Sequence, residues 1–311
     1  MKIKKIPKSK VRRMINWGWR QKAKTPTCPN EPLLKGKIIV ITGGNAGIGL
    51  ETVKGLLNRG AEVIILSRNK EKTESVIKRL NGKIHFVKLD LGDIGTIGAT
   101  VEGIINILNG RKIDILINNA GIALQEPCRL SPQGYELTFA VNVLGHHILF
   151  KECHSKSLLA LNAQIIAVTG DIYIQAADCT PNYKYEGKNG VSAYSRSKLG
   201  VMWWAFECHR LFPKYKVNIV HPGVVPMGLA ADQNSFFTRL LNALLLSPEG
   251  GAQMTLICAT QPHIKNGAYY NNVYGEALLP PKDIARDVES STKFWHTLEE
   301  IYETAFKTAK I

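Results

Sequence analysis

The chain has 311 residues, 45% of them hydrophobic, which is enough for one large α/β domain with a buried core. It contains no run of 18 apolar residues that could cross a membrane, and its first ten residues lack the apolar core of a secretory signal. Six cysteines without a C-x-x-C pair and eight histidines without metal-ligand spacing argue against a disulfide framework and a metal site, so we expect an intracellular protein without a metal.

Positive charge is concentrated in an N-terminal extension, which we place at residues 1–36. Residues 1–37 hold twelve Lys or Arg and one acid, Glu31, a net charge of +11, so the total of +15 leaves +4 for the rest of the chain. The segment SKVRRMINWGWR within this extension is typical of an amphipathic helix. Its apolar residues share one helical face and its arginines lie elsewhere: Val11, Met14, Ile15 and Trp19 against Arg12, Arg13 and Arg20.

This basic amphipathic segment indicates a partner. With its tryptophans it can lie on an anionic membrane surface, so we expect peripheral membrane contact through residues 9–24. Import into an organelle and a solvated tail are the alternatives. We therefore expect the protein in the cytosol or on the cytoplasmic face of the endoplasmic reticulum or a lipid droplet, ahead of the mitochondrion. No nucleic-acid-binding pattern follows the extension, so no nucleic-acid partner is expected.

From residue 37 to residue 311, short runs rich in Val and Ile alternate with longer amphipathic stretches. Continuous apolar runs indicate strands that are buried on both faces, here KIIVIT, AEVIIL, IHFVKLD, IDILINN, QIIAVT and KVNIVHP. The stretches between them, such as GLETVKGLLNRG, are long enough for crossover helices. The pattern predicts an α/β fold in a single domain, with a Rossmann-like, doubly wound parallel sheet.

The first of these strands ends in a glycine-rich turn, TGGNAGIG, directly before a helical pattern. Gly43, Gly47 and Gly49 let the turn tighten and let the backbone approach a pyrophosphate, whose charge then faces the helix N-terminus. We expect Asn45 and Ile48, in the same turn, to contact the dinucleotide as well. A tight turn without a ligand is the alternative, but the strand–turn–helix context favours the dinucleotide.

The second strand ends in Ser-Arg-Asn and so lacks the acid that would bind a ribose 2′-hydroxyl. Arg68 stands there instead, and a guanidinium suits a 2′-phosphate, so NADP is favoured over NAD. An ordinary exposed arginine is the alternative. After the third strand, Asp90 and Leu91 are placed to contact the adenine, unless Asp90 only caps the next helix.

Two further groups of polar residues follow later strands. Asn118, Ala120 and Gly121, which we expect to contact the dinucleotide, belong to the NNAG stretch after the fourth strand. Asparagine side chains there can also bind backbone groups of neighbouring strands. SAYSRSKLG opens a helix that places Tyr194 and Lys198 at i and i+4, on one face. A free tyrosine has a pKa near about 10, so a nearby cation is needed to favour its phenolate at neutral pH.

The apolar stretch NSFFTRLLNALLL, at 234–246, follows the last predicted core strand. Ligands of doubly wound sheets lie outside the carboxyl ends of the strands, so a helix here can wall a hydrophobic substrate pocket within segment 226–247. A core or dimer helix is the alternative. DCTPNYKYEGKNG, at 178–190, is rich in turn formers and predicts a surface loop.

Five motifs occur in order over nearly the whole chain from Lys37: TGGNAGIG, NNAG, VNVLGHH with Asn142, YSRSK and HPG. This series resembles that of the short-chain dehydrogenase/reductase family. The long loop before the tyrosine, the GHH stretch and SPEGGAQ late in the chain are similar to its branch of retinol dehydrogenases and WW-domain oxidoreductases. The resemblance implies a Rossmann-like fold and NAD(P)-dependent interconversion of alcohols and carbonyls.

The resemblance also implies roles for single residues. Tyr194 would be the proton donor or acceptor, Lys198 would lower its pKa and hold the nicotinamide ribose, and Asn142 would anchor a proton-relay water. In and after the HPG motif, dinucleotide contacts are implied for Pro222, Gly223 and Val225. The family's habit implies a homodimer that packs through the helix bearing Tyr194.

Two positions depart from the family pattern. The family places a serine at the end of the fifth strand, where it hydrogen-bonds the substrate oxygen, and here the alignable residues are Thr169, Gly170 and Asp171. One register puts Gly170 at the serine and a slide by one residue puts Asp171 there, whereas strand alternation sends Thr169 to the opposite face. Met227 stands where the family commonly has a threonine that clamps the nicotinamide amide.

The loss of one polarising donor typically costs about 10² to 10³ in rate, so impaired turnover is favoured over none. Asp171, Tyr173 or a water could supply the missing contact. We predict an NADP(H)-dependent oxidoreductase that acts by hydride transfer on a lipophilic, retinoid-, steroid- or lipid-like alcohol or carbonyl, with tyrosine as acid and base. The alternative is a dinucleotide-binding protein with weak or no turnover that acts as a regulatory or scaffold partner.

Overall fold

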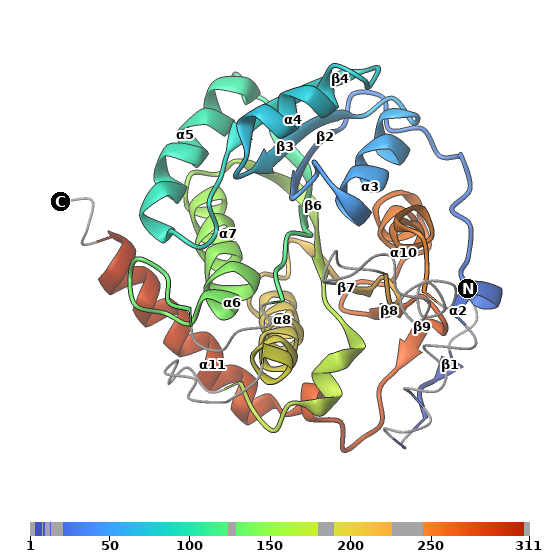
Figure 1. Cartoon of the computed structure of the whole chain (residues 1–311), viewed down its shortest axis with the longest axis vertical. Helices are drawn as coiled ribbons and strands as arrows, with labels where there is room; N and C mark the ends of the chain where they lie inside the picture. Colours follow the sequence, from blue (N-terminus) through green and yellow to red (C-terminus); the bar gives the residue numbers. More distant parts are fainter. Residues whose placement is uncertain are drawn as a thin grey trace, which may run out of the picture.

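The six Val- and Ile-rich runs form six neighbouring parallel strands, β2 to β7, as the sequence predicts (Figure 1). The structure, a computed structural model, describes residues 4–7, 9, 13, 21–123, 129–179, 190–225 and 245–307. These residues form one nine-stranded sheet in the order β1-β9-β8-β7-β6-β5-β2-β3-β4. The strand bounds are β1 Lys4–Lys5, β2 Ile38–Thr42, β3 Glu62–Ser67, β4 Lys83–Lys88, β5 Ile113–Asn118, β6 Leu159–Val168, β7 Lys216–His221, β8 Tyr269–Asn271 and β9 Gly275–Leu278.

The strand order reverses at β2. β3 and β4 lie on one side of β2, and β5, β6 and β7 lie on the other. Successive strands are therefore added in one direction after β2 and in the opposite direction after β5. Doubly wound sheets bind ligands at such a switch point, outside the carboxyl ends of the strands. β9 is antiparallel to β8, and β1 is parallel to β9 at the sheet edge. The predicted fold class is confirmed.

Helices cover both faces of the sheet because neighbouring residues of a buried strand point to opposite sides. Ile39 and Ile41 of β2 pack in the cluster that contains α3 and α10, whereas Ile38 and Val40 pack in the cluster of α5, α7 and α8 (Figure 1). The helical bounds are α2 Gln21–Lys24, α3 Gly47–Leu57, α4 Lys70–Ile77, α5 Ile97–Leu108, α6 Leu137–Phe139, α7 Gly145–Ser155, α8 Gly190–Leu211, α10 Pro248–Thr260 and α11 Val288–Ile301. Shorter turns are η1 Ile94–Thr96, η2 Ala140–Leu144, η3 Asp171–Gln175, η4 Ile284–Arg286 and η5 Tyr302–Lys307.

The C-terminal helix α11 packs against α8, the helix that carries Tyr194 (Figure 1). The Trp203 and Phe294 rings meet edge to face at 5.7 Å, and those of Trp204 and Trp295 stack at 6.4 Å between centroids. Such aromatic pairs stabilise the contact beyond the area they bury. One side of α8 is therefore covered from within the chain, and the homodimer stays a prediction.

The described residues of the N-terminal extension contact the domain. β1 extends the sheet, and Ile6, Arg13, Gln21 and Cys28 are buried. The amphipathic pattern placed Arg13 off the apolar face, and the structure shows that Arg13 is buried in an ion pair with Asp283. Most of the predicted amphipathic helix lies outside the described residues, so membrane contact through residues 9–24 stays a prediction. No helix within the described ranges is long and apolar enough to cross a membrane.

Candidate active site

The glycine-rich turn after β2 approaches its neighbours so closely that side chains are excluded. A β-carbon built on Gly49 would collide with the carbonyl oxygen of Gly43, and one on Gly43 would lie 3.1 Å from Ala120 Cα. Gly43 and Gly47 both have positive φ, at 69° and 51°, where glycine is favoured. Open space lies beside Gly47, at the first residue of α3. This turn therefore presents the helix N-terminus to an incoming anion.

The threonine that ends β2 links this turn to the NNAG stretch. Thr42 Oγ1 accepts hydrogen bonds from the backbone N–H groups of Asn119 and Ala120, each at 2.9 Å. The Asn119 side chain in turn donates to the Thr42 carbonyl oxygen at 2.8 Å. Asn119, rather than Asn118, thus makes the contact to the neighbouring strand that the sequence predicts for this stretch.

His146 extends the same network to the helix that follows Asn142. With both oxygen lone pairs of Thr42 used, its hydroxyl donates to His146 Nε2 at 2.9 Å, and His146 Nδ1–H donates to the Asn142 carbonyl oxygen at 3.2 Å. The imidazole is therefore neutral, and burial lowers its pKa to about 4. His146 holds the end of β2 and the Asn142 turn in one arrangement.

Acid is expected to destabilise the fold through its buried, neutral histidines. Burial lowers the pKa of His146 to about 4 and that of His147 to about 3, from 6.5 for a free side chain. Below pH 6.5 the unfolded chain binds protons that the folded chain does not, so the free energy of unfolding falls as the pH drops toward 4. Each histidine contributes a slope of up to about 1.4 kcal/mol per pH unit.

Urea midpoints measured from pH 7 to pH 4.5 test this prediction. His147→Phe removes one of these titrating groups, so the midpoint of the variant should depend less steeply on pH than that of the wild type. Equal slopes for the two proteins would contradict the assignment of His147 as a neutral buried group.

The turn after β3 presents Arg68 to solvent. Arg68 is exposed, and no ion pair to it is found within the described ranges. The preceding Ser67 is buried and hydrogen-bonded to Thr73, which also accepts from Asn45 Nδ2 at 3.0 Å. Asn45 thus connects the glycine-rich turn to the first half of α4, beside Arg68. The absence of an acid at the end of β3 leaves this corner positively charged.

Asp90 and Leu91 follow β4. The Asp90 carboxylate accepts from the Gly92 N–H at 2.9 Å, while Asp93 caps the following turn η1, so the alternative in which Asp90 caps the next helix is wrong. Leu91 is buried in the core and packs on Gly145 of α7. A contact of either residue with adenine stays a prediction.

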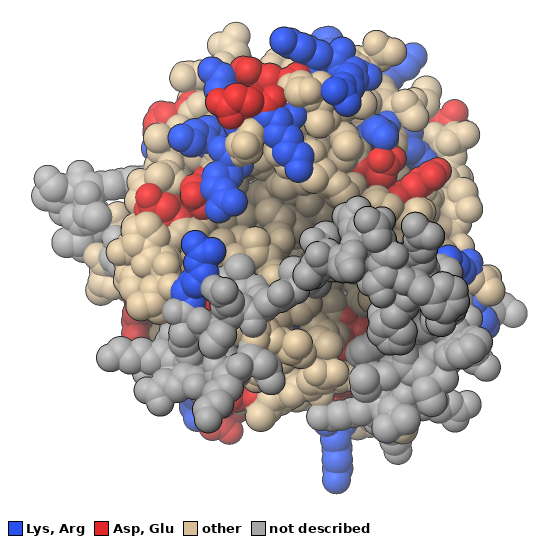
Figure 2. Space-filling model, in the orientation of Figure 1, with Lys and Arg blue, Asp and Glu red and all other residues tan. Residues whose placement is uncertain are grey.

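The carboxyl end of β5 carries an unsatisfied amide. Asn118 is buried, and neither side-chain polar atom has a hydrogen-bond partner in the described part of the chain. Buried polar groups are normally paired, so a ligand is a natural partner. Together with the cramped glycine turn and the exposed Arg68, this amide fits a dinucleotide in the crevice. The face of the molecule drawn in Figure 2 has a hollow near its centre, and Lys and Arg side chains lie on the rim of this hollow.

Asn142 lies in η2, a single wide helical turn of the kind often found at functional sites. Its amide donates to the Ile122 carbonyl oxygen and to Ser197 Oγ, each at 2.9 Å, and its Oδ1 accepts from the Ile122 N–H at 2.8 Å. Ser197 Oγ donates to the Tyr194 carbonyl oxygen at 2.8 Å. The Asn142 side chain therefore braces the chain after Gly121 against α8, and its role with a relay water stays a prediction.

Tyr194 and Lys198 lie on one face of α8, as the i, i+4 spacing predicts. Lys198 Nζ is 5.5 Å from the centroid of the Tyr194 ring, and it donates to the Val168 carbonyl oxygen at 3.2 Å. A β-carbon on Gly121 would lie 3.4 Å from this Nζ and 3.3 Å from Asn142 Oδ1. The structure thus brings the predicted catalytic residues together at the carboxyl ends of the central strands.

Burial governs the protonation of this pair. It raises the pKa of Tyr194 to about 12 and lowers that of Lys198 to about 8, because low polarity penalises both charged forms. The implied lowering of the Tyr194 pKa by Lys198 together with a bound dinucleotide stays a prediction. Tyr194 holds its proton at neutral pH, and Lys198 is charged below about pH 8.

The end of β6 resolves the two registers. Gly170 is the residue that faces Tyr194, because a β-carbon built on it would lie 3.8 Å from Tyr194 Oη with no atom nearer than 3.6 Å. Its backbone is extended, with φ at −149° and ψ at 137°, a conformation that any residue adopts. Thr169 points away, as predicted, and its hydroxyl donates to the Lys198 carbonyl oxygen at 2.8 Å.

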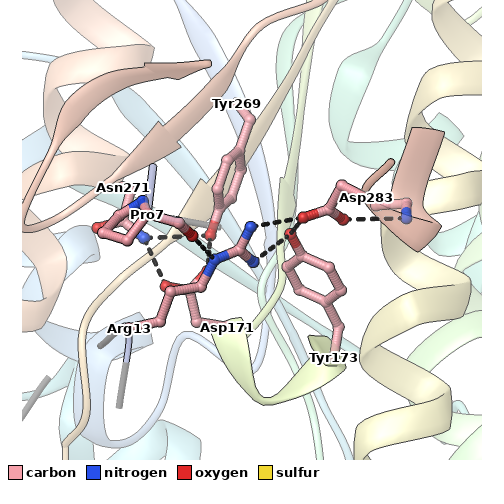
Figure 3. Close-up of polar contacts among 8 residues, drawn as sticks. Pro7, Arg13, Asp171, Tyr173, Tyr269, Asn271 and Asp283 are labelled. Atoms are coloured by element: carbon pink, nitrogen blue, oxygen red, sulfur yellow. Dashed lines mark hydrogen bonds and ion pairs between the residues drawn. The ribbon is translucent and has the colours of Figure 1, made fainter. Parts of the chain in front are cut away.

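Asp171 does not fill the serine's place. Its carboxylate is fully buried and accepts hydrogen bonds from Tyr269 Oη and from Asn271 Nδ2 (Figure 3). Tyr173 is also fully buried, and its hydroxyl donates to Asp283 at 3.2 Å. Both side chains satisfy structural partners, so the alternatives that assign the missing contact to Asp171 or Tyr173 are wrong.

The HPG stretch at the end of β7 lies beside the glycine-rich turn. A β-carbon on Gly251 of α10 would lie 2.8 Å from Val225 Cγ2 and 3.0 Å from Ile48 Cγ1, so both residues pack over the same glycine. Pro222 is buried, and Gly223 has a φ of 87°. Met227, most of the apolar segment 226–247 and most of the loop 178–190 lie outside the described residues.

Three residues of this site were not assigned a role from the sequence. Thr42 and Ser197 have no pattern that marks them, because a hydroxyl's partners depend on which strands and helices become neighbours. His146 was considered only as one of eight histidines, which lack the spacing of metal ligands. Its i, i+4 relation to Asn142 is the signal that could have indicated their contact.

A doubly wound sheet with a glycine-rich turn and a Tyr–Lys pair at its switch point defines a nicotinamide-dinucleotide-dependent oxidoreductase. Residues 37–236 match the family model for short chain dehydrogenase, and the chain belongs to this family.

Related proteins agree with this assignment. An uncharacterized oxidoreductase of Schizosaccharomyces pombe is 30% identical over 86% of each chain. Human retinol dehydrogenase 13 is 29% identical over 86% of this chain and 85% of its own length. The crystal structure of the angucycline C-6 ketoreductase LanV with bound NADP has a TM-score of 0.63 at 24% identity, and the match covers 78% of this chain and 96% of that one. This last likeness concerns the fold.

Proposed function

We propose that the protein is an NADP(H)-dependent oxidoreductase that interconverts an alcohol and a carbonyl on a lipophilic substrate. The observation that carries the proposal is the placement of the Tyr194 ring beside Lys198 with its hydroxyl opposite Gly170, at the carboxyl ends of the strands. The retinol dehydrogenases among its relatives support a retinoid-like substrate. The bound dinucleotide would supply or accept the hydride.

The protonation of the site supports the reducing direction. Because the pKa of Tyr194 is about 12, its hydroxyl carries a proton that it can donate to a carbonyl oxygen at neutral pH. Lys198, charged below about pH 8, lies close enough to stabilise the phenolate that remains. Asn142 and Ser197 hold the backbone around Tyr194, which fixes the direction of the hydroxyl.

Arg68 supports NADP as the cofactor. We expect the wild type to bind NADPH about 10- to 100-fold more tightly than NADH, since charge-assisted hydrogen bonds from a guanidinium to a 2′-phosphate contribute about 1.5–3 kcal/mol. Arg68→Asp should reverse the order, because a carboxylate repels the phosphate and accepts from a ribose hydroxyl. Fluorescence titration with both cofactors measures this ratio.

Lys72→Asp is the matched control for this experiment. Lys72 is exposed on α4, four residues beyond Arg68, and its substitution changes the net charge by the same amount. It should leave the order of the two cofactors unchanged. Equal affinity of the wild type for NADPH and NADH would refute the assignment of Arg68.

A second candidate function is dinucleotide binding with little or no turnover, in a regulatory or scaffold role. Gly170 favours it, because the family's substrate-binding hydroxyl is missing at the position that faces Tyr194. The assembled Tyr194, Lys198 and Asn142 favour the enzyme. Turnover that depends on Tyr194 distinguishes the two.

A further inference from the structure

Described residues of the N-terminal extension contact the parts of the chain that follow β6 and β7. Its first strand, β1, pairs with β9, and Ile6 donates its N–H to the Leu278 carbonyl oxygen at 3.1 Å. Two polar side chains of this segment, Arg13 and Gln21, are at most 3% exposed. One partner of Arg13, Tyr173, lies in η3 after β6, and one partner of Gln21, Val224, lies after β7.

Arg13 occupies a socket built from η3 and η4 (Figure 3). Its Nη2 forms an ion pair with Asp283 Oδ2 at 2.6 Å, its Nη1 donates to Tyr173 Oη at 3.2 Å, and its Nε donates to the Pro7 carbonyl oxygen at 2.9 Å. The planar guanidinium satisfies three acceptors in fixed directions, which an ammonium cannot reproduce. Asp283 also accepts from Tyr173 Oη and caps η4.

This socket fixes the turn that carries Gly170. η3 begins at Asp171, directly after Gly170, and is held at two points. At its first residue, Asp171 is bound by Tyr269 and Asn271 of β8, and two residues later Tyr173 is bound by Arg13 and Asp283. The N-terminal extension supplies one of the two partners of the second anchor, Arg13.

Gln21 makes the corresponding contact on the cofactor side. Its side chain is fully buried, and Oε1 accepts from the Val224 N–H at 2.9 Å. Thr25, one helical turn later, accepts from Asn272 Nδ2 at 2.7 Å and so ties this helix to the end of β8. Val224 precedes Val225, and Val225 packs over Gly251 together with Ile48 of the glycine-rich turn.

We propose that the N-terminal extension contributes two positioning residues to the active site, Arg13 and Gln21, one for each of its two halves. Arg13 positions η3 and Gly170 on the substrate side, and Gln21 positions residues 222–225 on the dinucleotide side. This inference rests on the proposed function. It predicts that substitution of Gln21 changes the Kd for NADPH and that substitution of Arg13 changes kcat/KM for the substrate. A general contribution to stability would change both quantities in both variants.

The first arm of the test measures NADPH binding by fluorescence titration of the full chain, without substrate. Gln21→Ala removes the acceptor for the Val224 N–H and should raise the Kd for NADPH about tenfold, the effect of one lost hydrogen bond. Gln21→Glu keeps an acceptor oxygen and should recover most of the affinity. Lys22→Ala, on the exposed side of the same helix, should match the wild type.

The second arm measures NADPH-dependent reduction of all-trans-retinal. Arg13→Met should lower kcat/KM for retinal about tenfold and leave the Kd for NADPH within twofold. The double variant Arg13→Met with Asp283→Asn removes both charges and keeps the oxygen that caps η4, so its thermal stability should recover. Its turnover should stay low, because Tyr173 still lacks the guanidinium.

Each outcome decides a separate claim. A wild-type chain that binds no NADPH would overturn the proposed function, whereas NADPH binding that is unchanged in Gln21→Ala would overturn the cofactor half of this inference. If turnover recovers together with stability in the double variant, Arg13 only holds the fold together and the substrate half is wrong. If the wild type binds NADPH but reduces no retinal, the substrate half is overturned, and the Gln21 arm decides the cofactor half.

Discussion

Tyr194→Phe is expected to lower NADPH-dependent turnover by about 10² to 10⁴-fold, the usual contribution of a positioned proton donor. The variant keeps the ring that packs beside Lys198 and removes only the hydroxyl opposite Gly170. NADPH binding should therefore stay within about twofold of the wild type. The decrease in NADPH absorbance with all-trans-retinal, a steroid ketone and an aliphatic aldehyde as substrates measures turnover.

The same variant separates the two candidate functions. Wild-type turnover that disappears in Tyr194→Phe identifies an enzyme that uses this hydroxyl. If the wild type binds NADPH but reduces none of the three substrates, and the Gly170 variant described next creates no activity, the binding function is favoured. Turnover that persists in Tyr194→Phe would mean that another group donates the proton.

Gly170→Ser is expected to raise turnover by about tenfold or more, because it restores a hydroxyl donor beside the substrate oxygen. Removal of one such donor elsewhere costs about 10² to 10³ in rate. The site can accept the side chain, since the backbone of Gly170 is extended and the nearest atom to a β-carbon there is 3.6 Å away. In that position the serine side chain would lie next to Tyr194 Oη, where the substrate oxygen is proposed to bind.

Gly170→Ala is the matched control, because it adds the β-carbon without the hydroxyl. If the serine acts as a donor, turnover should increase in Gly170→Ser and stay at or below the wild-type level in Gly170→Ala. An equal increase in both variants would show that filling space matters rather than hydrogen bonding. A decrease in both would show that the substrate itself occupies the space beside Gly170.

The parts of the fold that depend on local pattern could be predicted from the sequence. Runs of Val and Ile identified β2 to β7, because a strand buried on both faces must be apolar along its whole length. The glycine-rich turn could also be placed, since strand, glycines and helix follow one another directly. The i, i+4 spacing of Tyr194 and Lys198 gave their common face.

Contacts between distant segments could not be predicted in this way. Whether Gly170 or Asp171 faces Tyr194 depends on where β6 ends, and that end is set by the partners of Asp171 on β8. The sequence pattern placed Arg13 on the polar side of a helix, and its ion pair partner is 270 residues away. No local periodicity records such a pairing.

A crystal structure of the full chain with NADPH tests the central claim most directly. The account predicts that the 2′-phosphate contacts the Arg68 guanidinium, that the pyrophosphate lies on the Gly43–Gly49 turn, and that the nicotinamide ends beside Tyr194 and Gly170. A dinucleotide whose nicotinamide lies away from Tyr194, or whose 2′-phosphate does not approach Arg68, would contradict it.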